Sequence, residues 1–380
     1  MWLTSLFARP AADDVQRQRR ASLLYSILTV LLPLLVVTTG MFVLKAVHID
    51  KEYIDAITKA ILDTRSYPPV DSAQSAIADI TGRFRFAAAH TLLVITAYVG
   101  VAAGIVVAVS ALRDNGGLPR DIGILALAVM VATLLFALCW KLYGLNFVPG
   151  IKVRDFFIYL TPEMLAKSGY QDALKLLEQL ERRGGYGGAV AIAAAGSLTV
   201  AAMVLAYRWR TPVWRQPRLL QRQFGSLLTL FAISSVLLVV SNTAVRSLLE
   251  WPVRVLPPSP DGKAASLLEP VRGMAGAMSY WWSVISTAVL LATFLPAFVR
   301  LMTDFNLAAI ESLRQDTGGS TGGSPSGAVG DPTAKEIKDW KERHGLLMSS
   351  GEITTAIIAS AAPLLTAPTI DLAKSIVAPS

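Results

Sequence analysis

The chain has 380 residues, of which 53% are hydrophobic and only 16% are charged, and its mean hydropathy is +0.50. Soluble domains carry about 25% charged residues, so this composition excludes an ordinary soluble protein and indicates one that crosses a lipid bilayer. The net charge of +8 would suggest nucleic acid in a soluble protein. In a membrane protein, basic loops that set orientation explain it more simply, and no nucleic-acid partner is expected.

Six segments are long and apolar enough to cross the bilayer. The hydrocarbon layer is about 30 Å thick and needs about 20 residues of helix. Backbone groups in lipid must find their hydrogen bonds within the segment, so each span should be helical. No span contains Asp, Glu, Lys or Arg. The spans are residues 23–44, 86–112, 122–140, 187–206, 224–245 and 277–299. The predicted fold is therefore all-α, a polytopic membrane bundle of about six transmembrane helices within residues 1–316.

The loop between the fourth and fifth spans predicts the orientation of the chain. It carries five arginines and no acidic residue, namely Arg208, Arg210, Arg215, Arg218 and Arg222. Basic residues of short loops are retained on the cytoplasmic side, so we expect these arginines to set the topology there or to contact anionic lipid. Six spans then place both termini in the cytoplasm, and the setting that we expect is a bacterial inner (plasma) membrane.

Two stretches on the predicted outer side show helical spacing of apolar residues. Isoleucines and a leucine recur in residues 51–66, and leucines lie three apart in residues 171–183. We expect short amphipathic helices that lie on the membrane surface or pack together as a small cap. Gly184 and Gly185 are expected to separate the second of these helices from the fourth span.

After the last span, the sequence predicts a linker and a tethered cytoplasmic tail. A polar helix over residues 303–315 is expected to continue into the cytoplasm. Residues 317–330 are rich in Gly and Ser and predict a flexible linker. The tail, residues 331–380, begins with an Asp-Pro pair that is typical of a helix start.

The first helix of the tail has an apolar face formed by Ile337, Trp340 and Leu347. Aromatic anchors of this kind dominate protein interfaces, which favours a partner protein or a neighbouring subunit, with docking onto the chain's own bundle as a close alternative. The apolar run that begins at residue 353 is shorter than a span before it meets Pro363. It predicts an interfacial, re-entrant or docked segment, and a seventh span is an open alternative.

Small residues mark two spans as packing helices. The second span contains Gly100-x-x-x-Gly104, and the fourth repeats a small residue at every fourth position: Gly187, Ala191, Ala195 and Thr199. Such ladders let helix backbones approach closely in lipid. Contact within the bundle and contact with another subunit are both consistent with the pattern.

The chain shows no motif of a known catalytic or cofactor site. It contains no P-loop, no HExxH, no G-x-S-x-G and no dinucleotide fingerprint. The single cysteine, Cys139, excludes a disulfide within the chain and a cysteine-rich metal site. His48 and His90, both expected near the outer face, are the best pair for a metal or haem, but their spacing is not diagnostic. No catalytic residue, cofactor or metal is therefore predicted.

These observations favour a non-catalytic integral membrane protein that acts as a subunit, anchor or effector of a membrane assembly. Membrane lipids, other membrane subunits or further copies of the chain are the expected partners. A channel or passive transport protein is the alternative, because hydroxyls and small residues can line a pore. A membrane-embedded enzyme or cofactor carrier is a third hypothesis, which the sequence favours less than the other two. Spans without ionisable residues argue against a proton-driven mechanism.

Overall fold

The computed structural model describes residues 12–46, 73–114, 120–143, 173–207, 217–255, 263–319 and 332–344, and these ranges are helical with no strand among them. The helices are α1 (Ala12–Ala46), α3 (Ala73–Asp114), α4 (Arg120–Tyr143), α7 (Ala173–Ala206), α8 (Pro217–Val255), α9 (Lys263–Gly319) and α10 (Ala334–Arg343). The predicted all-α fold is confirmed.

Each of the six predicted spans lies within one long helix of its own. The stretches long and apolar enough to cross a membrane are Arg20–Gly40, Ile80–Asp114, Ile122–Leu142, Gly185–Ala206, Pro217–Ser247 and Tyr280–Arg314. Several helices continue well past the lipid. The longest, α9, has 57 residues, which at about 1.5 Å per residue is far longer than the bilayer is thick.

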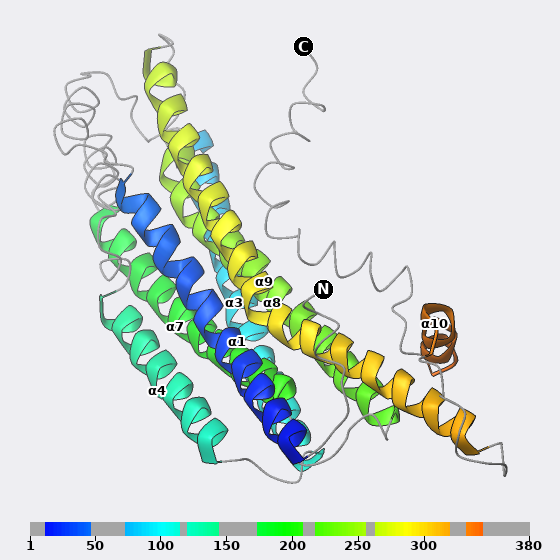
Figure 1. The fold of residues 1–380 in the computed structure, drawn as a ribbon. Helices are drawn as coiled ribbons and strands as arrows, with labels where there is room; N and C mark the ends of the chain where they lie inside the picture. The colour runs from blue at the N-terminus through cyan, green and yellow to red at the C-terminus, as the bar shows by residue number, and fades with distance from the viewer. Residues whose placement is uncertain are drawn as a thin grey trace.

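Helix α7 lies at the centre of the bundle (Figure 1). It contacts α1, α3, α4, α8 and α9, while α3 also packs on α8, and α9 packs on α1 and α8. Neighbouring spans alternate in direction, so α1, α4 and α8 begin at the end of the bundle where the spans of α3, α7 and α9 finish. We call this end the basic end, because Arg218 and Arg222 of the predicted arginine loop lie there, at the start of α8.

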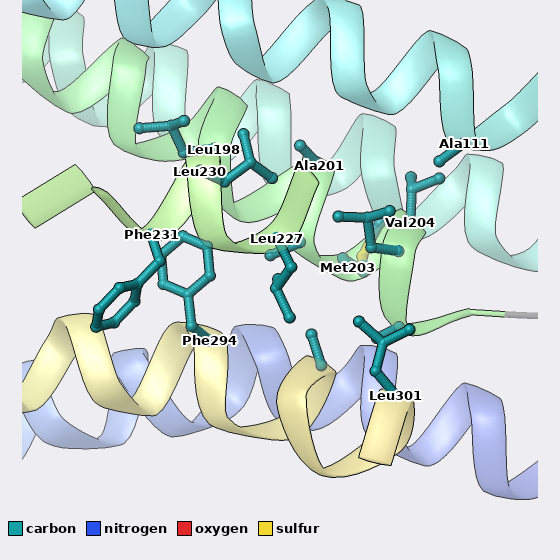
Figure 2. Close-up of a cluster of buried hydrophobic side chains, with 14 of the residues drawn as sticks. Ala111, Leu198, Ala201, Met203, Val204, Leu227, Leu230, Phe231, Phe294 and Leu301 are labelled. Carbon is teal, nitrogen blue, oxygen red and sulfur yellow. The ribbon is translucent and has the colours of Figure 1, made fainter. Parts of the chain in front are cut away.

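The core joins α7, α8 and α9 through large apolar side chains (Figure 2). Phe231 of α8 and Phe294 of α9 meet edge to face with ring centroids 5.5 Å apart. Phe224 makes similar contacts with Phe298 and Phe305. The outward faces of α1, α3 and α4 expose large apolar side chains such as Leu34, Val106 and Leu134. In a chain with six membrane-spanning helices, these faces contact lipid.

One predicted helix boundary is wrong. Helix α7 runs without interruption through Gly184 and Gly185, so these glycines do not end the helix. The end of α4 lies alongside, and a Cβ on Gly185 would lie 3.8 Å from the Lys141 carbonyl oxygen, an ordinary van der Waals distance. Helix α9 also includes residues 317–319 of the predicted linker.

Several predicted features lie outside the described residues. They are His48 and residues 51–66, 320–331 and 345–380; the last range contains Leu347 and the possible seventh span.

Candidate functional site

Two charged residues are buried in the helix of the last span. Arg300 and Asp304 on α9 have exposed fractions of 6% and 4%, and Arg300 Nη2 lies 3.5 Å from Asp304 Oδ1. Both belong to the apolar stretch Tyr280–Arg314. The sequence analysis missed this pair because it ended the last span at residue 299. The available signal was the spacing of four between opposite charges, which places both side chains on one side of a helix.

Helix α1 contributes a polar residue at the same level of the bundle. The two helices are antiparallel, and a Cβ on Gly40 would meet the side chains of Trp281 and Ile285. Ser22 lies 18 positions before Gly40, while Arg300 and Asp304 lie 15 and 19 positions after Ile285. At about 1.5 Å per residue in both helices, Ser22 is level with the charged pair. Ser22 is fully buried.

Helix α8 adds Gln223, whose exposed fraction is only 2%. Its neighbour Phe224 contacts both Phe298 and Phe305, which places this turn of α8 beside the turn of α9 that holds Arg300. We call the buried residues Ser22, Gln223, Arg300 and Asp304 the polar layer.

The end of α7 is buried at the same end of the bundle. Residues 201–207 are all buried, although the last carbonyls of a helix have no partner within it. Ser26 Oγ donates to the Met203 carbonyl at 3.2 Å, and the backbone N–H of Tyr207 donates to the Met203 and Val204 carbonyls. The partially negative end of the α7 dipole therefore lies on the side of the bundle that holds a buried guanidinium, an arrangement that favours positive charge.

Burial makes the polar layer energetically demanding. Removing a charge from water costs several kcal/mol, and an ion pair recovers this only with good geometry and further hydrogen bonds. Among the residues that the structure describes, Arg300 Nε and Ser22 Oγ have no hydrogen-bond partner, and a buried polar atom left in that state costs about 1–3 kcal/mol. Buried ionisable residues in membrane-crossing helices are rare and mark functional sites by default. The polar layer is therefore the candidate functional site.

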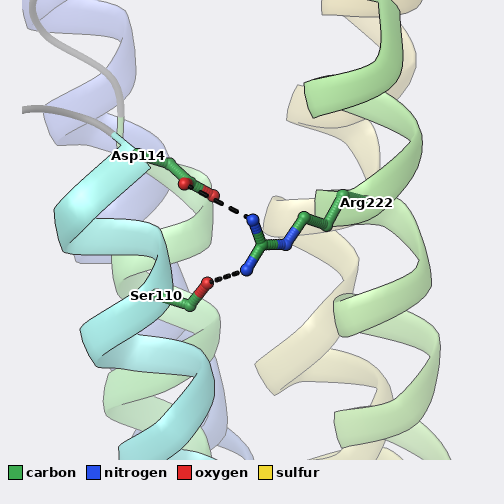
Figure 3. A network of polar contacts seen from close by, with 3 residues as sticks. All are labelled: Ser110, Asp114 and Arg222. Carbon is green, nitrogen blue, oxygen red and sulfur yellow. Dashed lines mark hydrogen bonds and ion pairs between the residues drawn. The ribbon is translucent and has the colours of Figure 1, made fainter.

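The predicted arginine loop has one member with defined contacts (Figure 3). Arg222 Nη2 donates to Ser110 Oγ at 2.8 Å, and Arg222 Nη1 lies 3.8 Å from Asp114 Oδ1. Arg222 thus ties the start of α8 to the end of α3, although its side chain is 64% exposed. Arg218 is exposed on α8. Arg208, Arg210 and Arg215 lie outside the described residues.

The predicted small residues fall into two groups. Gly100 and Gly104 of α3 face α7: a Cβ on Gly100 would lie 3.4 Å from Ala194 Cβ, and one on Gly104 would lie 2.9 Å from the Ser197 carbonyl. Gly187 is also buried, and a Cβ there would lie 2.6 Å from His90 Nε2.

The rest of the ladder on α7 is less enclosed. Ala191 and Thr199 are half-buried and Ala195 is exposed, so the close contacts of α7 run instead through Ala194, Gly196 and Ser197. The ladder as a whole is not the line of closest packing within the chain. A contact between its exposed part and a second subunit stays a prediction.

The tail helix α10 docks onto the chain's own α9. Trp340 is 2% exposed, and Ile337 packs beside it against the core. Lys341 Nζ donates to Asn306 Oδ1 on α9, and burial lowers the pKa of Lys341. For Ile337 and Trp340, the structure shows the alternative that the sequence left open, which is docking onto the chain's own bundle. Their face is covered and is not free for a partner.

Helix α10 begins with a complete capping box. Thr333 Oγ1 accepts from the Glu336 backbone N–H at 3.3 Å, and the Glu336 carboxylate accepts from the Thr333 backbone N–H at 2.7 Å. The backbone N–H of Thr333 and then its hydroxyl both donate to the Glu336 carboxylate, and this lowers the pKa of Glu336. Isolated helices shorter than about 12 residues are marginal in water, so this helix of 10 residues depends on its cap and on α9.

His90 of the proposed histidine pair makes packing contacts: its ring lies 5.8 Å from that of Phe86, and it lies against Gly187. His48 lies outside the described residues, so the pair stays a hypothesis. Among the residues that the structure describes, no group of three or more His, Cys, Asp or Glu side chains could hold a metal ion.

Many hydroxyl groups of the spans are already satisfied within their own helices, where each donates to the carbonyl four residues earlier, a common arrangement in helices. They are Thr29, Thr133, Thr199, Thr229, Thr243, Ser247, Thr287, Thr293 and Thr303. Asn242 differs, because its side-chain amide donates across the α8–α9 interface to Ser283 Oγ at 3.2 Å.

Comparison with protein-family models, curated proteins and solved structures finds no match to this chain.

Proposed function

We propose that this chain is a non-catalytic integral membrane protein that acts by association, as a subunit, anchor or effector of a membrane assembly. The observation that carries the proposal is α9. One helix contains the last span and continues to Gly319, and α10 packs on it near Asn306. A continuous helix of this kind holds α10 at a set position relative to the bundle (Figure 1).

The surface that α10 offers to a partner is charged. Its apolar side is used against α9, and its exposed side chains are Lys335, Glu336, Lys338, Asp339, Glu342 and Arg343. Charges of both signs keep this surface soluble and can select a partner by electrostatic complementarity. The α9–α10 unit is then a platform that the membrane bundle anchors.

The proposed setting is a bacterial inner membrane with both termini in the cytoplasm. The five loop arginines support this orientation through the positive-inside rule, and Arg20, Arg113 and Arg120 are further exposed basic residues at the same end. This end would meet anionic lipid headgroups. Other membrane subunits or further copies of the chain are the proposed protein partners.

Cross-linking in native membranes tests the proposal. Truncation after Gly330, or the pair K335E and K338E, should leave an inserted protein but remove its cross-linked species of higher mass. The matched control is R85E, a charge reversal at an exposed site on α3, which should keep them. A full-length protein that forms no cross-link and has the mass of one chain in mild detergent would overturn the proposal.

A channel or passive transport protein is the second candidate, and the polar layer favours it, because buried ionisable residues line the paths of solutes in many membrane proteins. Purified protein in liposomes distinguishes the two functions. Release of trapped potassium or chloride faster than from empty liposomes, and lost in R300M, would favour transport. Equal rates would leave association as the better account.

A further inference from the structure

The polar layer contains two buried atoms that need a hydrogen-bond partner. They are Ser22 Oγ on α1 and Arg300 Nε on α9. Their residues have exposed fractions of 0% and 6%, so bulk solvent does not cover them. Buried polar atoms in native proteins are nearly always paired with protein or with ordered water. Two such atoms on neighbouring helices at one level indicate a shared partner.

The layer is enclosed on the side that faces the middle of the bundle. On α9, Ala297 and Leu301 lie about one turn apart, and both are fully buried. On α1 the next buried hydroxyl, Thr29, is already satisfied by the Tyr25 carbonyl. Among the described residues, the buried side-chain atoms that lack a partner therefore lie at the level of Ser22 and Arg300.

The layer is not completely closed. The side chains of Arg300 and Asp304 keep 8% and 6% of their surface exposed, and Tyr207 at the end of α7 keeps 8%. Ala297 lies about one turn deeper and Leu301 lies beside the pair, and neither has any exposed surface. The charged pair therefore keeps a small accessible surface, while these apolar neighbours keep none.

The chemistry of the layer selects water. Arg300 and Asp304 carry opposite charges that balance, so a bound cation would be repelled by the first and a bound anion by the second. A water molecule can accept from Arg300 Nε and either donate to or accept from Ser22 Oγ. Buried waters typically make two to four such hydrogen bonds to otherwise unsatisfied groups.

We propose that the polar layer is a water-binding site, continuous with the aqueous side at the basic end, in which water bridges Ser22 and Arg300. The site hydrates the Arg300–Asp304 pair inside the helix bundle and ends at the apolar layer of Ala297. It does not depend on the association function proposed above.

Thiol reactivity tests this site from the basic end. A C139A background removes the one native cysteine, and single cysteines are then placed by S22C, A297C and R218C. A small methanethiosulfonate reagent modifies the thiolate, which forms only where water reaches the sulfur. We expect S22C to react at least about tenfold faster than A297C, and its rate to rise with pH. The exposed R218C sets the upper rate. If S22C reacts as slowly as A297C while R218C reacts fully, the proposal is overturned.

The sign of a stability change gives a second, independent test that needs no reagent. A dry, unsatisfied hydroxyl destabilises the fold, so S22A would then stabilise it. A hydrated hydroxyl has its hydrogen bonds, so we expect S22A to leave the unfolding midpoint in sodium dodecyl sulfate unchanged or lower. A clear increase in that midpoint would contradict the site.

Discussion

Substitution of Gly104 by alanine should destabilise the bundle by driving α3 away from α7. The new Cβ would lie 2.9 Å from both the carbonyl carbon and the carbonyl oxygen of Ser197, well inside the roughly 3.5–4.0 Å at which carbon atoms attract. These atoms belong to the backbone of α7, so no rotamer change can relieve the contact. The same shift would stretch the hydrogen bond from Ser197 Oγ to the Val101 carbonyl, now 3.2 Å long.

The magnitude follows from comparison with a second helical glycine. Replacing glycine by alanine in a helix gains about 1 kcal/mol of intrinsic propensity, while forcing extra volume into a packed site costs about 1–3 kcal/mol. A Cβ on Gly225 would have no neighbour within 4 Å, so G225A should show the gain alone. The propensity term cancels between the two variants, and G104A should be about 1–3 kcal/mol less stable than G225A.

Unfolding by sodium dodecyl sulfate in mixed micelles, followed by circular dichroism, measures the difference. G100A provides an internal comparison within the same GxxxG motif, because its nearest contacts would be an ordinary 3.4 Å from Ala194 and Leu198 side chains. It should therefore be about as stable as G225A. If G104A proves as stable as G225A, helix α3 does not pack on α7 as described, and the reasoning is refuted.

Four further predictions concern the tail helix, its cap, the arginine contact and the orientation. W340A removes the buried anchor of α10, for which losses of about 3–5 kcal/mol are usual in cores, so trypsin should cleave within residues 334–343 much faster than in the exposed-site control E342A. The lowered pKa of Glu336 contributes stability above its usual value of 4.5, and this contribution is lost as the pH falls through the lowered value. Amide exchange at the start of α10 should therefore accelerate in acid, corrected for the intrinsic pH effect, and E336Q should abolish that dependence. R222A should cost less than about 1 kcal/mol in the same unfolding assay because the Arg222 side chain is 64% exposed. A larger loss would show that the contact with Asp114 is stronger than this exposure implies. In intact cells, an impermeant thiol reagent should reach a cysteine placed at Ser259 and miss one at Gln216 in the C139A background; the opposite pattern would invert the proposed topology.

The existence and number of the spans could be predicted from the sequence because the bilayer imposes a local requirement. Each crossing segment must satisfy its own backbone and be apolar along its whole length, so residues 122–140 or 224–245 reveal themselves without knowledge of their neighbours. The same holds for the start of α10, since the hydrogen bonds between Thr333 and Glu336 join residues three apart.

The tertiary structure decided what depends on residues distant in the chain. Gly184 and Gly185 are typical helix breakers, yet α7 continues through them and packs against α4. Arg300 follows the last span as a charge that would ordinarily reach water, and it is buried because α1, α7 and α8 converge on that turn of α9. Trp340 is a typical interface anchor, but only the packing of α10 on α9 decides that the chain's own bundle covers it. Local chemistry selects the helices, whereas burial is set by the neighbours that each helix meets, and no single segment of the sequence encodes those neighbours.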